Sequence, residues 1–175
     1  MKLQLIPKPG KGEYPAYADM YINLLAAGEN VLQELKENFQ LVKQLIFSLP
    51  GEKLLYRYAP GKWTIKEVLV HIIDDERIYA YRALRFARND KTELPGFEQD
   101  DYTLSSGAND RSLESIFDEY EAVRWSTIAM FNSFTAEALV RKGIANNNLA
   151  TVRALAWHIA GHELHHLNII RQRYL

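Results

Sequence analysis

The chain has 175 residues, of which 47% are hydrophobic and 25% charged, an ordinary composition for one globular domain. The 21 basic and 22 acidic side chains leave a formal net charge of −1 without long runs of either sign, which argues against a nucleic-acid partner. Cysteine is absent, so the chain has neither a disulfide nor a thiol nucleophile of its own. No stretch approaches about 18 uninterrupted apolar residues, and the proline-containing start does not resemble a signal peptide. We therefore expect a cytoplasmic protein without a membrane span.

The first half of the chain predicts an arm followed by helices. Residues 1–15 hold three prolines and are expected to be extended, and residues 16–26 predict a short helix. Helical periodicity runs over residues 30–49 until Pro50 and Gly51 end it. After a turn at residues 58–62, Thr64 and Glu67 have the spacing of a capping box, and the following helix is expected to reach about Ala87.

The second half predicts a long loop and two more helices. Residues 91–109 hold a proline and two glycines and are expected to form an ordered loop. Residues 112–134 and 151–173 have helical periodicity, and a turn at residues 143–148 separates them. No strand alternation is evident. The pattern therefore predicts an all-α fold, a four-helix bundle that forms a single domain over residues 1–175.

Four of the five histidines fall within the last predicted helix. They are His158, His162, His165 and His166, and the fifth is His71. A neutral imidazole is a frequent metal ligand, and the clustering favours a metal site. Two other interpretations remain open, a polar surface stripe and core histidines bonded to the backbone. Either would leave a plain helical bundle without metal.

Helical geometry selects two of these four histidines. At about 100° per residue, His162 and His166 lie about 40° apart in the middle of the apolar face of the helix. His158 lies at the edge of that face, and His165 lies just beyond it. Two inward imidazoles one turn apart can bind one ion.

His71 is the candidate for a third ligand, because it shares an apolar face with Val68 and Ile72 on its own helix. Asp75 lies one turn later on the same face, where it would either orient the His71 ring or act as an additional ligand. Arg82 also points inward. Its side chain either extends along apolar surface to reach solvent or binds an anionic group of a substrate. Trp63 is expected in the core.

The segment from His162 to His166 also satisfies the H-E-x-x-H pattern of zinc proteases. Only nine residues follow His166, which leaves no room for the usual downstream ligand. The longer metzincin pattern fails as well, because Ile169 stands where it requires glycine. A protease is therefore disfavoured. Glu163 is interpreted either as a solvent-facing carboxylate or as a residue with a role beside the metal.

Three segments of the sequence resemble the DinB family, the DinB/YfiT-like metalloenzymes. They are Gly61–Arg77, Pro95–Tyr102 and Gly161–His166, and the resemblance covers nearly the whole chain from about Tyr17. It implies a four-helix bundle with an up-down-down-up path. It also implies a divalent metal site, usually with zinc or nickel, whose ligands by position are His71, His162 and His166.

The resemblance also implies several activities. Some relatives resemble transferases that join a low-molecular-weight thiol to an electrophile, others resemble thiol-dependent isomerases, and dimers are common. We expect a metal-dependent enzyme with a small-molecule substrate, such as a thiol S-transferase, and a homodimer. The candidate catalytic residues are Asp75, Arg82 and Glu163. The alternatives are a non-catalytic metal-binding stress-response module and a metal-dependent hydrolase that uses the H-E-x-x-H-like segment.

Overall fold

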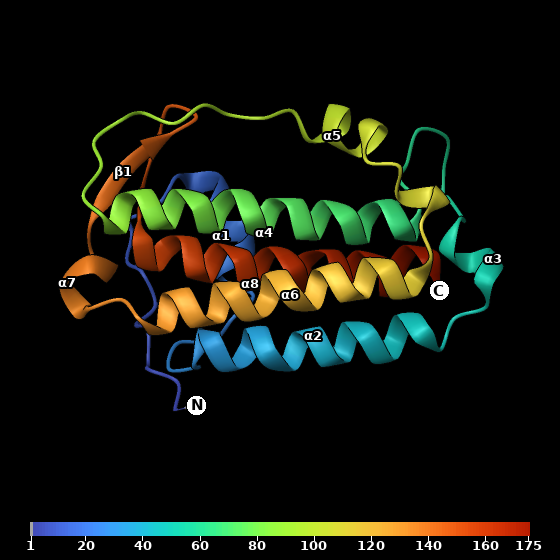
Figure 1. Ribbon diagram of the computed structural model, residues 1–175, viewed down its shortest axis with the longest axis horizontal. Helices are drawn as coiled ribbons and strands as arrows, with labels where there is room; N and C mark the ends of the chain where they lie inside the picture. Colours follow the sequence, from blue (N-terminus) through green and yellow to red (C-terminus); the bar gives the residue numbers. More distant parts are fainter. Residues whose placement is uncertain (1) are drawn as a thin grey trace.

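Four long helices form the body of the protein in the computed structural model, which describes residues 2–175 (Figure 1). They are α2 (Val31–Phe47), α4 (Ile65–Ala87), α6 (Leu113–Asn132) and α8 (Val152–Ile169). The bounds agree with the predicted helices to within a few residues. Met1, the first residue of the predicted arm, lies outside the described part of the chain.

The helices follow an up-down-down-up path. In Figure 1, α2 runs from left to right, α4 and α6 both run back, and α8 runs parallel to α2. Consecutive helices α4 and α6 are therefore parallel, and a long crossover joins them. This crossover carries α5 (Gln99–Ser105) and the short η2 (Ala108–Asp110) over α4. The predicted all-α, four-helix bundle fold is confirmed.

Each long helix begins at a side chain that caps it. The hydroxyl of Thr64 accepts a hydrogen bond from the Glu67 amide, and the Glu67 carboxylate accepts one from the Thr64 amide, which confirms the predicted capping box. Asn30, Ser112 and Thr151 cap α2, α6 and α8 in the simpler one-bond form.

The structure differs from the sequence prediction in its short elements. The predicted turn at residues 143–148 is part of an antiparallel hairpin, β1 (Lys142–Ala145) and β2 (Asn148–Thr151). Asn146 and Asn147 have positive φ at its tip, as a tight hairpin turn requires. Strands of four residues are too short to show alternation. The predicted loop over residues 91–109 contains α5 and η2.

Further short helices complete the described chain. The predicted helix at residues 16–26 consists only of η1 (Ala16–Ala18) and α1 (Asp19–Ile22). The other elements are α3 (Gly51–Leu54), α7 (Ala136–Leu139) and a final π-helical turn, η3 (Ile170–Tyr174). Within residues 2–175, no helix has the length and apolar character needed to cross a membrane.

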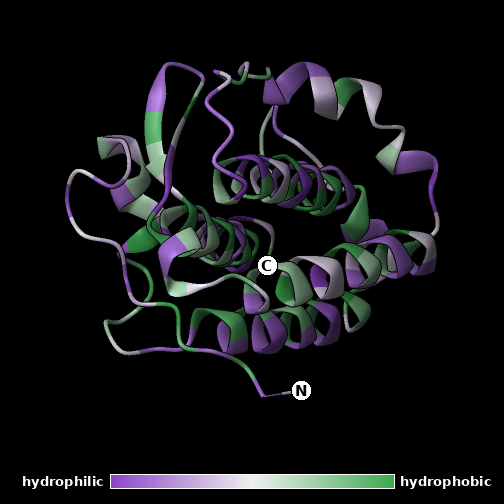
Figure 2. Ribbon diagram, turned by 60° about the vertical axis from the view of Figure 1, so that its left-hand side comes forward, coloured by the Kyte–Doolittle hydropathy of each residue, from purple (hydrophilic) through white to green (hydrophobic). Residues whose placement is uncertain are grey.

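In the bundle, α4 and α2 each pack against both α6 and α8. In Figure 2, hydrophobic and hydrophilic residues both occur along the helices. The helix α8 is buried nearly all round, since residues 154–163 are all buried. The buried hydrophobic residues divide into two clusters, one around Trp157 and Phe86 and the other around Phe39 and Tyr120.

A mid-bundle polar layer lies between the two hydrophobic clusters along the helices. Its buried members are His71, Asp75, Glu76, Arg124, His158, His162 and Glu163. Burying so many polar and ionisable groups costs free energy unless each has a partner. The contacts of each group in this layer therefore show whether it has a stabilising partner in the bundle or is available to bind a ligand.

Candidate metal centre

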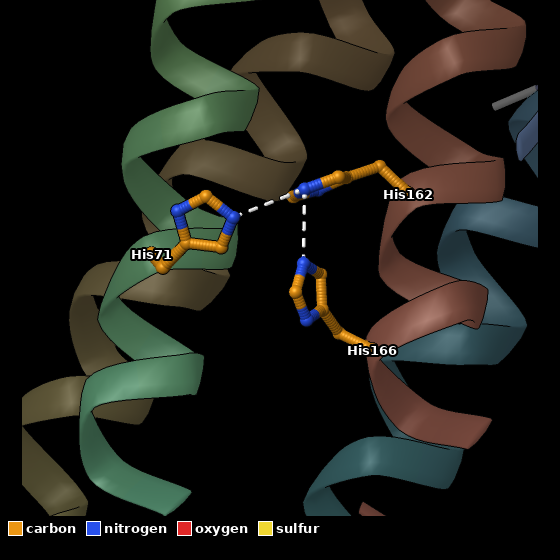
Figure 3. A group of neighbouring side chains, drawn as sticks. All are labelled: His71, His162 and His166. Atoms are coloured by element: carbon orange, nitrogen blue, oxygen red, sulfur yellow. Dashed lines mark hydrogen bonds between the residues drawn. The ribbon is translucent and has the colours of Figure 1, made fainter. Parts of the chain in front are cut away.

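Three imidazoles converge in this layer. His71 projects from α4, and His162 and His166 project from α8, with their rings pointing toward one another (Figure 3). The Nε2 atom of His162 lies 3.1 Å from Nε2 of His71 and 3.1 Å from Nε2 of His166. One ligand nitrogen from each ring falls within 4.8 Å of the others. The structure thus brings together the three histidines that the sequence selected.

This donor set fits a divalent ion. A neutral imidazole has one N–H and one lone pair, so Nε2 of His162 cannot make two good hydrogen bonds with the two rings that it faces. Ligand nitrogens at about 2.0–2.1 Å from a tetrahedral zinc ion would lie roughly 3.3–3.4 Å apart, close to the separations here. A small outward movement of the rings would accommodate the ion.

The protonation states also suit metal binding. Burial lowers the pKa of His71 and holds that of His162 well below its ordinary value. Burial, together with the neighbouring His71 and His165, lowers the pKa of His166 to about 3. All three rings are therefore neutral near pH 7, which is the form that binds a metal.

Asp75 lies against His162 rather than His71. Its Oδ2 atom is 3.4 Å from Nδ1 of His162 and 3.5 Å from Nε2 of His158. Burial acts to raise the pKa of this carboxyl, but His162 and His158 hold it at about 2. The expectation that Asp75 orients His71 is corrected, because one-turn spacing sets the face of a helix but not the partner across the interface.

His158 belongs to the wall of the site and not to the three-histidine cluster. Its ring stacks on Tyr79 at 3.8 Å between centroids, and its Nε2 faces Asp75. Neither this nitrogen nor Oδ2 of Asp75 has a well-aligned hydrogen-bond partner in the described chain. Both residues line an open cleft of about 300 Å³ that also reaches His162.

The sequence analysis missed Tyr21, which comes from the short α1. Its ring meets the edges of three histidines, with centroids 5.0 Å from His158 and 5.3 Å from His162 and His165. Gly161 permits this contact, because a β-carbon there would overlap the backbone carbonyl of Tyr21. A glycine in the middle of a histidine-rich helix is the sequence signal for such a close approach.

Glu163 is fully buried and lies in a different cluster, so the solvent-facing interpretation is wrong. The hydroxyl of Tyr120 donates a hydrogen bond to its Oε1, and Nη1 of Arg124 donates one to its Oε2 over 2.9 Å. Arg124 also pairs with Glu76 from α4 and donates a hydrogen bond to the Leu35 carbonyl of α2. These contacts join all four long helices and occupy both carboxylate oxygens of Glu163.

A second cleft, of about 320 Å³, opens beside His166, with Asp100 and Gln99 of α5 at its rim. Trp63 lines it, half-buried, with its ring 4.7 Å from that of His71. Trp63 therefore packs against the hydrophobic core, as expected, and also lines this cleft. Gln99 borders both clefts, so the crossover covers the region between them.

The fold and the site define a four-helix bundle protein with histidines from facing helices gathered in its interior, where such bundles build metal and cofactor sites. The model of the DinB superfamily matches residues 34–170, and the chain belongs to this superfamily.

Two similar proteins support this assignment. One, from Oceanobacillus iheyensis, is provisionally named a metal-dependent hydrolase, OB0413. It is 26% identical over 146 residues, which cover 80% of this chain and 81% of that protein. The other is the solved structure of YfiT from Bacillus subtilis, described as a probable metal-dependent hydrolase with an unusual four-helix bundle topology. It matches with a TM-score of 0.68 and 16% identity over 85% of this chain and 90% of YfiT, and so shows the shared fold.

Proposed function

We propose that this protein is a metal-dependent enzyme in which His71, His162 and His166 hold one divalent ion, with zinc and nickel as the leading candidates. The observation that carries the proposal is the convergence of three neutral, largely buried imidazoles, in which Nε2 of His162 lies 3.1 Å from Nε2 of each of the other two. An ion bound by three neutral ligands keeps its double charge and an open position, which lowers the pKa of a coordinated water or thiol.

The chain's own residues support and shape this site. Oδ2 of Asp75 lies 3.4 Å from Nδ1 of His162, and a proton on that nitrogen would leave the Nε2 lone pair free for the ion. Tyr21 and Trp63 pack against the histidine rings and restrict their rotation. The two clefts beside His162 and His166 give a small molecule access from the surface.

Glu163 is not available as a proton acceptor at this site, because Tyr120 and Arg124 occupy its carboxylate. This argues against a hydrolase that uses the H-E-x-x-H-like segment in the manner of zinc proteases. A thiol is more acidic than water and depends less on a protein base. The leading reaction is therefore the transfer of a low-molecular-weight thiol to an electrophile. Hydrolysis is the second candidate, because both relatives are described as metal-dependent hydrolases.

Cobalt-substituted protein would distinguish these reactions. It is titrated with bacillithiol, mycothiol, glutathione and cysteine, and a sulfur-to-cobalt charge-transfer band in the near ultraviolet is expected with at least one thiol. That thiol is then assayed for conjugation to an electrophile, and the same preparation is assayed for hydrolysis of activated esters and amides. Esterase or amidase activity that requires His162, without any thiol band, would support the hydrolase. Full metal occupancy with neither result would support the non-catalytic metal-binding module.

From the resemblance to the DinB family we also propose that the protein forms a homodimer. Sedimentation of the metal-loaded protein tests this by measuring its molar mass in solution.

A further inference from the structure

Arg82 is a buried cation without an anionic partner. Its residue is only 6% exposed, yet no carboxylate of residues 2–175 lies within 4.0 Å of its guanidinium. Its hydrogen bond to the protein runs from Nη2 to the Pro95 carbonyl over 3.1 Å. Arg124, the other deeply buried arginine, pairs with both Glu76 and Glu163. An arginine buried in a native protein normally finds such a partner, so Arg82 points to a ligand that supplies it.

The position of Arg82 connects it to the candidate metal centre. It lies eleven residues after His71 on α4, and helical side chains lean toward the N-terminus, which here means toward the three histidines. Its guanidinium carbon lies 4.9 Å from the centroid of the Tyr79 ring and 6.0 Å from that of Phe97. Both rings also line the cleft of about 300 Å³ that reaches His162. Arg82 itself lines a neighbouring cleft of about 280 Å³ that shares Phe97 with the first. A molecule that passes along Phe97 from one cleft into the other would have the guanidinium at one end and the histidines at the other.

The surroundings also limit the charge of such a molecule. One guanidinium offers a single positive charge and a planar set of donors that matches a carboxylate. Asp75 and Glu98 line the adjoining cleft that reaches His162 and would repel a dianion such as a phosphate monoester. The rings of Tyr79 and Phe97 favour an apolar or aromatic body next to the charged group.

We propose that Arg82, with Tyr79 and Phe97, forms a subsite for the carboxylate of an elongated monocarboxylic acid with an apolar or aromatic body. This inference rests on the proposed function in one respect, because it takes the far end of the bound molecule to be the reacting end. The subsite itself requires no metal.

The test compares an acid with its neutral analogue on the intact protein. Chelator-treated and zinc-loaded protein are each titrated with 4-phenylbutyrate, 4-phenylbutyramide and phenylphosphonate, and binding is followed by calorimetry. In both preparations the acid is expected to bind at least about 10-fold more tightly than the amide, as for a charge-assisted contact. The phosphonate is expected to bind more weakly than the acid. Equal binding of acid and amide, or tighter binding of the phosphonate, would overturn the proposal.

Variants assign the effect to this arginine. Arg82→Met is expected to weaken acid binding by about 10- to 100-fold while leaving amide binding unchanged. Arg82→Lys should retain part of the preference, because it keeps the charge but not the planar donors. Arg88→Met is the matched control, since Arg88 is exposed at the end of the same helix. A preference for the acid that survives in Arg82→Met would also overturn the proposal.

The two proposals fail in different ways. If the histidines hold no metal, the acid-over-amide preference of the chelator-treated protein is still expected. If Arg82 forms no subsite, metal binding by the histidines is unaffected. Should Arg82→Met fail to fold, the comparison of acid and amide on the unmodified chain still decides.

Discussion

The mid-bundle polar layer contains two clusters that differ in how completely their members are paired. In one, Arg124 is held by Glu76 and Glu163, so that each charge faces an opposite charge. In the other, Nε2 of His162 faces the Nε2 atoms of His71 and His166, each at 3.1 Å, although a neutral imidazole nitrogen can make only one good hydrogen bond. In the first cluster every carboxylate oxygen accepts a hydrogen bond, whereas the donor set of the second fits a divalent ion. Pairing, and not burial alone, separates a stabilising network from a binding site.

Two adjacent residues of α8 belong to different clusters. His162 turns toward α4 and the other histidines, whereas Glu163 turns toward α6 and Arg124. Consecutive residues of a helix point about 100° apart, so neighbours in an H-E-x-x-H pattern need not serve one site. The substitutions below should therefore affect metal binding or folding stability separately.

The largest expected effect is on metal content. His162→Ala or His166→Ala should remove most of the bound divalent metal, because each variant deletes one of three ligands. Metal analysis of the purified variants after dialysis measures it. His165→Ala is the matched control, since His165 lies in the same turn outside the three-histidine cluster, and it should retain about one ion per chain. Equal metal content in all three variants would contradict the ligand assignment.

Substitutions in the cluster around Arg124 should lower stability without removing the metal. Arg124→Met leaves Glu76 and Glu163 buried without their cation, and we expect it to lower the free energy of unfolding by about 3–5 kcal/mol. Urea denaturation of the metal-free protein measures this change. Protein that remains folded should still bind one metal ion. A substitution that abolished metal binding in folded protein would show that the two clusters are coupled.

The sequence predicts the fold well because the long helices carry strong local signals. Each has a capping residue at its start, and apolar periodicity sustained over several turns. The hairpin between α7 and α8 has strands of only four residues, too short for alternation to distinguish them from a turn. The crossover helix α5 contains several polar residues and packs on α4 from outside the bundle.

The sequence predicts only those features of the site that depend on the geometry of a single helix. Spacing along one helix identifies which side chains share a face, and it selects His71, His162 and His166. It does not identify partners on another helix, so the contact of Asp75 with His162 and that of Glu163 with Arg124 were not foreseen. Tyr21 is still less predictable, because α1 is a single turn that gains its position from packing against Gly161.

A smaller effect on metal binding is expected for substitution of Asp75, which lies next to the ligand His162 but is not itself one of the three histidines. Asp75→Asn should weaken metal binding by about 10- to 100-fold, because the carboxylate no longer strengthens and orients the His162 ring. Competition with a chromophoric chelator measures the affinity, and circular dichroism verifies the fold. Asp74→Asn is the matched control, since Asp74 is the adjacent carboxylate outside the polar layer. Equal affinities for both variants would mean that Asp75 does not act on the metal site.

The last expected effect is a gradual one, the pH dependence of stability in the metal-free protein. Burial holds the pKa of His71 and His162 below the ordinary value of 6.5, so the folded rings stay neutral where the unfolded chain takes up protons. The unfolded state then binds more protons than the native state, and the free energy of unfolding falls as pH decreases below about 6.5. The slope should reach at most about 1.4 kcal/mol per pH unit for each such histidine.

Urea denaturation at several pH values between 7 and 4.5 tests whether the free energy of unfolding falls with pH as expected. That window lies above the range in which Asp75, with a pKa of about 2 in the folded protein against 3.8 ordinarily, adds its own loss of stability. His162→Gln removes one of the titrating rings and should therefore show a shallower slope than the unmodified chain. Arg124→Lys retains the charge of the paired cluster and should change the overall stability without changing the slope. Equal slopes for His162→Gln and the unmodified protein would show that the His162 ring takes up a proton as readily in the folded as in the unfolded state. That result would contradict the assignment of His162 as a buried, neutral member of the three-histidine cluster.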